Sequence, residues 1–112
     1  MHPSWSLPAR WPYLAAASLA HKWTRRIPVE WRDPKKADFD RFSETMREHQ
    51  DDHVLVQCAA NYRASAMTYL YRVVVEKVRE DEAAEDLHAV WDPNDNATWR
   101  EYINDIKMAG HM

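Results

Sequence analysis

Apolar residues recur at intervals of three and four in several stretches of the chain, which is the spacing of one buried helix face. Each stretch is bounded by residues that break or cap a helix, and Asn96 is expected to cap the last of them. The pattern therefore predicts a series of amphipathic helices. The stripes are Phe39, Phe42 and Met46; Met67, Leu70, Val74 and Val78; Leu87, Val90 and Trp91; and Trp99, Tyr102, Ile103 and Ile106.

Shorter segments have the character of strands. Ile27–Trp31 alternates apolar and polar residues, and His53–Gln57 is short and rich in β-branched residues, as is typical of a buried parallel strand. Residues 12–24 are rich in alanine instead, and their propensity predicts a short helix. Asp33 and Pro34 are expected to open the helix that follows, Asp33 as its cap and Pro34 at its first position.

A strand followed by a short loop and a helix is the basic unit of an α/β fold. The chain has 112 residues, which is the length of one domain with a single core. We expect an α/β fold in which a small parallel sheet is packed by helices and the C-terminal half is helical. We predict an N-terminal arm with a short helix over residues 1–26 and the domain itself over residues 27–112.

Composition excludes several function classes. The chain has one cysteine and one glycine, Cys58 and Gly110. One cysteine excludes an intramolecular disulfide and a Cys-rich zinc site, so we expect a reducing, cytoplasmic location. One glycine excludes both the dinucleotide-binding and the Walker-type phosphate loop. The six histidines have no metal-ligand spacing, and no metal or cofactor is expected.

The charge balance and the tryptophans bear on partners. A formal net charge of -3 is too balanced to attract nucleic acid, and no apolar run reaches the ~20 residues of a membrane-spanning helix. We therefore predict neither a nucleic-acid nor a membrane partner. Trp5, Trp11 and Trp23 give the N-terminus an unusual aromatic content, which suits packing on the domain or a contact in a homodimer.

The cysteine lies where chemistry is expected. Cys58 ends the predicted strand, and Arg63 follows as the next helix begins. Backbone amides at a helix N-terminus favour an anion, and an arginine supplies a planar fork for two oxygens of a phosphate or sulfate. A nucleophile and an anion site are therefore available in one loop. A single cysteine can equally be a small buried apolar side chain.

This region resembles a known family. The run from Val54 to Val73 is similar to the signature strand, loop and helix of bacterial protein tyrosine phosphatase-like proteins of the dual-specificity superfamily. Ile27–Trp31, the helix with Phe39 and Phe42, and the segment from Ala89 to Asn94 are similar to other parts of it. The resemblance covers roughly residues 27–106. It implies a phosphatase-like sheet that is shortened at its N-terminus.

The resemblance also implies roles for residues. Cys58 would attack the phosphorus of a phosphorylated protein or a small phosphomonoester, and Arg63 would hold the phosphate oxygens. Asp33 is the nearest candidate for the acid that protonates the leaving oxygen. The residues that would bind substrate are Ala59, Ala60, Asn61, Tyr62, Ala64 and Ser65.

Several positions differ from the usual signature. Four residues rather than five separate Cys58 from Arg63, Gln57 replaces the usual His, and Ala64 replaces the usual Ser or Thr. Asn61 or Tyr62 replaces the glycine of the loop, and asparagine tolerates the positive φ of a tight turn. Two alternatives stay open: a catalytically silent module that binds phosphate groups or a protein, and a rhodanese-type sulfurtransferase, which shares the six-residue loop.

Overall fold

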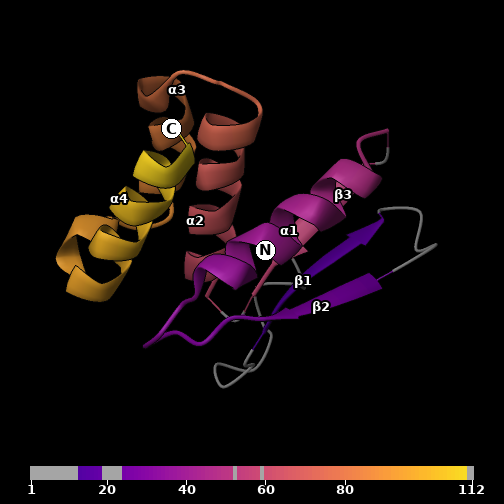
Figure 1. Cartoon of the computed structure of the whole chain (residues 1–112), viewed down its shortest axis with the longest axis horizontal. Helices are drawn as coiled ribbons and strands as arrows, with labels where there is room; N and C mark the ends of the chain where they lie inside the picture. Colours follow the sequence, from indigo (N-terminus) through magenta and orange to yellow (C-terminus); the bar gives the residue numbers. More distant parts are fainter. Residues whose placement is uncertain (1–12, 19–23, 52, 59, 111–112) are drawn as a thin grey trace.

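The computed structural model describes residues 13–18, 24–51, 53–58 and 60–110 (Figure 1). Within these residues a sheet lies on one side of the molecule and most of the helices on the other. The strands are β1 (Tyr13–Ser18), β2 (Thr24–Pro28) and β3 (Val54–Gln57), and their order across the sheet is β2-β1-β3. This part of the chain is a small α/β domain, as predicted.

The sheet is antiparallel, so the predicted parallel sheet was wrong. β1 lies in the centre and runs antiparallel to both β2 and β3. The two outer strands consequently run in the same direction, but β1 separates them and they do not pair. The sequence suggested a parallel pair because the strand between them was not recognised.

β1 replaces the helix that was predicted over residues 12–24. Ala15 and Ala16, on opposite faces of β1, are 4% and 0% exposed. Ala16 is the partner of Arg25 on β2 and of Val56 on β3. Pairing on both sides satisfies the backbone of a central strand, and this tertiary context overrides the helix propensity of alanine. The boundary drawn at residue 26 falls inside β2.

The helices are α1 (Lys36–Glu48), α2 (Tyr62–Leu70) with a π-helical continuation η2 (Tyr71–Val75), α3 (Glu80–His88), a 3-10 turn η3 (Pro93–Asp95) and α4 (Ala97–Gly110). The first and last predicted stripes lie within α1 and α4. Val78 of the second stripe lies beyond η2, and Val90 and Trp91 of the third lie beyond α3, so that prediction was wrong at these positions. Asn96 caps α4 as predicted, because its Oδ1 accepts a hydrogen bond of 3.1 Å from the Trp99 amide. No helix among the described residues is both long and apolar enough to cross a bilayer.

The core lies between one face of the sheet and the helices. Ile27 of β2 belongs to the buried cluster, and Val56 of β3 packs against it from the same face of the sheet. α1 contacts β2, whereas α2 contacts β3, α3 and α4. The predicted stripe residues Phe42, Met67, Leu70 and Trp99 are the largest of the fully buried side chains.

The start of α1 differs from the prediction. The residue that caps this helix is Lys35, and its amide donates a hydrogen bond of 2.9 Å to Oδ2 of Asp38 in the first turn. Asp33 and Pro34 precede the helix, and the Asp33 amide donates instead to the Glu30 carbonyl at 3.1 Å in a turn. The predicted cap was wrong because a carboxylate inside the helix already satisfies the free amide.

Candidate active site

Two hydrogen bonds between Cys58 and Asn61 close the turn between β3 and α2. The Cys58 amide donates to Oδ1 of Asn61 at 3.0 Å, and the Asn61 amide donates to the Cys58 carbonyl at 3.3 Å. Asn61 has a φ of 63° and is 5% exposed. Of the two residues that could replace the glycine of the loop, Asn61 or Tyr62, it is Asn61 that adopts the positive φ. The turn therefore brings Cys58 to the beginning of α2.

The sulfur of Cys58 contacts the first turn of α2. The Ala64 amide donates to Sγ at 3.4 Å, and Cys58 itself is 1% exposed. The amides of a first helical turn have no carbonyl partner within the helix, and they carry the positive end of its dipole. Sγ is thus the acceptor for one of these amides.

Arg63 is anchored to the segment that follows β2. Its side chain is 9% exposed, and Nη1 donates to the Val29 carbonyl at 3.0 Å. Val29 follows β2 and is fully buried, so this bond joins the segment after β2 to the start of α2. A guanidinium has five N–H donors in a planar fork, and the bond to Val29 fixes the plane of that fork.

An aromatic cluster supports the outer side of the same turn. Tyr62, which is 40% exposed, stacks on Trp91 with ring centroids 4.8 Å apart and planes inclined by 15°. Trp91 Nε1 donates to Ser65 Oγ at 3.0 Å, and that hydroxyl donates to the Tyr62 carbonyl at 3.0 Å. The Ser65 hydroxyl, a predicted substrate ligand, therefore already holds the first turn of α2.

Trp31 extends this cluster toward the core. Its ring lies 5.4 Å from that of Trp91 and 5.4 Å from that of Trp99, measured between centroids. The Trp99 indole N–H also donates to the Trp31 carbonyl at 2.8 Å. Sequence reasoning did not assign Trp31, Trp91 or Val29 to the site. The signal for the two tryptophans is their position, because each comes shortly before an Asp-Pro pair at a turn.

Asp33, the candidate acid, lies in the exposed turn before α1. Its carboxylate pairs with Lys35 at 2.6 Å, and the Asp33 side chain is 65% exposed. The hydrogen bond that the Lys35 ammonium donates to the Asp33 carboxylate raises the pKa of Lys35 above its ordinary value. No contact described in the structure links Asp33 to Cys58, so its catalytic assignment stays a prediction.

The structure describes only some of the other positions in and beside the loop. Ala60 is exposed, and Ala59 lies outside the described residues. Oε1 of Gln57 is buried and has no hydrogen-bond partner among the residues that the structure describes. The tryptophans proposed for a dimer contact, at positions 5, 11 and 23, also lie outside those residues.

The chain is similar to one solved protein structure in particular. That structure is the "Putative phosphatase (DUF442)" from Shewanella putrefaciens CN-32, with 30% sequence identity and a TM-score of 0.58. The match covers 74% of this chain and 52% of that chain, so the chain spans about half the length of the protein it matches. No protein-family model and no curated protein matches the chain. The expected resemblance to a phosphatase is thereby supported at the level of the fold.

Proposed function

We propose that the chain carries a cysteine-dependent phosphatase site that hydrolyses phosphomonoesters, with Cys58 as the nucleophile. The observation that carries the proposal is the hydrogen bond of 3.4 Å from the Ala64 amide to Cys58 Sγ at the N-terminus of α2. A helix N-terminus is suited both to a thiolate and to the phosphate that it attacks. The similarity to a structure described as a phosphatase supports the same reaction class.

The reaction divides into two displacements. Cys58 Sγ donates an electron pair to phosphorus, and the bond from phosphorus to the ester oxygen breaks, which gives a phosphocysteine and an alcohol or phenol. The leaving oxygen takes a proton from an acid, for which Asp33 is the candidate. Water then attacks phosphorus, and the sulfur–phosphorus bond breaks to release phosphate and restore the thiolate.

Arg63 is the proposed clamp on the phosphate oxygens. Its fork is held by Val29 through Nη1, so donors on its other edges would face the charge that develops on the oxygens. The first-turn amides of α2 that do not donate to Sγ, such as that of Tyr62, would complete the anion site. Asn61 would act by holding the turn, since its side-chain oxygen already accepts the Cys58 amide.

The test combines turnover of an aryl phosphate with binding of an inert oxyanion. We expect Cys58→Ser to abolish turnover of p-nitrophenyl phosphate while phosphate still binds with nearly the wild-type Kd. Arg63→Lys is expected to lower kcat/KM by about 100-fold, because an ammonium cannot replace the fork. Arg100→Lys is the matched control: Arg100 also donates to a backbone carbonyl, that of Asn94 at 3.2 Å, but its side chain lies on the exposed side of α4.

Two other outcomes would contradict the proposal and select an alternative. Phosphate binding by the wild-type chain without any turnover favours the silent phosphate-binding module. Two observations favour that alternative: Cys58 is buried, and the Asp33 carboxylate is paired with Lys35. Transfer of sulfur from thiosulfate to cyanide, dependent on Cys58, favours the sulfurtransferase. Asp33→Asn separately tests the role of Asp33 as the acid. If Asp33 protonates the leaving oxygen, the variant should have a lower kcat for esters with poor leaving groups.

A further inference from the structure

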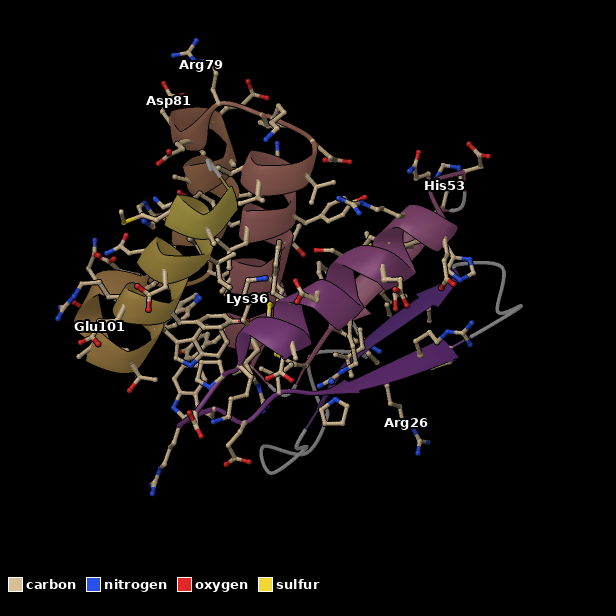
Figure 2. The ribbon with its side chains drawn as sticks, in the orientation of Figure 1. Arg26, Lys36, His53, Arg79, Asp81 and Glu101 are labelled. Atoms are coloured by element: carbon tan, nitrogen blue, oxygen red, sulfur yellow. The ribbon has the colours of Figure 1, made fainter. Side chains whose placement is uncertain are left out.

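The two edges of the sheet differ in their protection against pairing with another strand. β2 carries Arg25, Arg26 and Pro28, all exposed, and Arg26 projects from the strand away from the helices (Figure 2). Charged side chains and proline are the usual devices that keep an edge strand unpaired. β3 has neither over Val54–Gln57, and all its side chains are half-buried. Among the described strands it pairs only with β1.

A groove lies directly beside β3. It has a volume of about 200 Å³, and it lies between Val56 of β3, one side of α2 and α3. This is less than the ~300–1,000 Å³ of a small-molecule pocket, and it suits a single aliphatic side chain. Val90, at the rim, is 38% exposed. The apolar lining comes from Val56, Ala64, Tyr69, Ala83, Leu87 and Val90.

α3, which forms one wall of the groove, carries an excess of acidic side chains. α3 bears a carboxylate at most positions of its exposed side, and Figure 2 shows Asp81 at its outer end. Arg72, Arg79 and Lys107 pair with some of these carboxylates, so negative charge remains in excess. Of these carboxylates Asp86 lines the groove. It pairs at 2.7 Å with Arg72, which also lines the groove, and it is 80% exposed. The acidic side chains of α3 are Glu80, Asp81, Glu82, Glu85 and Asp86.

We propose that β3 and this groove, together the β3 edge site, bind an extended basic peptide segment of a partner protein. The segment adds a strand along β3, and its main chain bonds to the edge of Val54–Gln57 that faces away from β1. One apolar side chain enters the groove, and lysine or arginine two residues to either side faces the carboxylates of α3. Alternate side chains of a strand point to the same face, so this spacing is the one that the site selects.

The probe is a fluorescein-labelled peptide, Thr-Lys-Thr-Leu-Thr-Lys-Thr, titrated with the whole chain and followed by fluorescence anisotropy. We expect saturable binding that weakens about tenfold when Glu replaces both Lys, and also weakens in high salt. Ala in place of Leu is expected to weaken binding about fivefold. A peptide N-methylated on the amides of one strand edge should not bind, because it cannot pair with β3.

Variants of the chain locate the site. Val90→Lys places a cation at the rim and is expected to raise the Kd at least fivefold. Met108→Lys is the matched control, because Met108 is 70% exposed on α4 and does not line the groove. Equal binding by both variants overturns the proposal, as does equal binding of the N-methylated peptide. A concentration-dependent dimer that Val90→Lys dissociates would also overturn it and assign this edge to a second copy of the chain.

Discussion

The turn before α2 depends on a single asparagine that performs two separable tasks. Asn61 adopts a φ of 63°, which glycine tolerates and alanine does not, and its Oδ1 accepts the buried Cys58 amide at 3.0 Å. Asn61→Gly keeps the backbone conformation and removes the hydrogen bond. Asn61→Ala removes the hydrogen bond and also places in the left-handed region a residue without the tolerance that asparagine has for it. The difference between the two variants therefore measures the backbone term alone.

The magnitudes follow from these contacts. A buried amide left without an acceptor costs about 1–3 kcal/mol, so Asn61→Gly is expected to lower the free energy of unfolding by that amount. The left-handed conformation costs an L-residue other than asparagine about 1–2 kcal/mol. Glycine avoids this cost, but it makes the unfolded chain more flexible, which lowers the free energy of unfolding of Asn61→Gly by about 0.5–1 kcal/mol. Asn61→Ala is consequently expected to be about 1 kcal/mol less stable than Asn61→Gly.

Urea unfolding followed by tryptophan fluorescence measures both free energies. Lys77 is the matched control, since it has a φ of 61°, is exposed, and makes no side-chain hydrogen bond or ion pair with the described part of the chain. Lys77→Gly should therefore leave stability unchanged or raise it by up to about 1 kcal/mol. If Asn61→Gly is as stable as the wild type, the hydrogen bond from the Cys58 amide to Asn61 does not stabilise the fold. Equal stability of the two Asn61 variants would refute the requirement for a positive φ.

Two further predictions concern buried polar groups. Gln57→Met keeps the side-chain length and removes the buried Oε1, which has no partner in the part of the chain that the structure describes. It is expected to raise the free energy of unfolding by about 1 kcal/mol in urea titrations, and a loss of stability would contradict this. Burial, and to a lesser degree the Asp38 carboxylate, raise the pKa of the Tyr102 hydroxyl well above its ordinary value of 10.0. Above pH 10 the unfolded chain releases this proton while the folded chain retains it, so the free energy of unfolding is expected to fall as the pH rises above 10. Between about pH 8 and pH 11 the melting temperature of Tyr102→Phe should therefore decrease less than that of the wild type.

The helices could be predicted because their core contacts repeat with the period of the helix. Phe39 and Phe42, for example, are both buried at the positions that their spacing indicates. β1 could not be predicted in the same way. Its alanines have a high helix propensity and no period-two pattern, and their strand conformation depends on partners at residues 24–28 and 54–57. The antiparallel sheet follows from that one unrecognised strand.

In the site, too, contacts between residues close in sequence could be predicted and contacts between distant residues could not. The Cys58 turn and the positive φ of Asn61 are set within a few residues, so residue type and spacing were sufficient to predict them. The bond from Arg63 to Val29 spans 34 positions, and the bond from Trp91 to Ser65 spans 26. Such contacts depend on how α2 packs against other elements, and no short motif encodes them.

These distant contacts give the proposed anion site its rigidity. The first turn of α2 is held from the inside by Arg63 on the Val29 carbonyl and from the outside by Trp91 on Ser65. Donors that already have their final orientation need not reorganise when charge develops on a phosphate, and this is the main source of electrostatic stabilisation in such sites. An arginine can do this while anchored, because its other N–H groups remain oriented by the bond to Val29. A lysine has one ammonium for both tasks, and for that reason we expect Arg63→Lys to lose turnover even where the fold is retained.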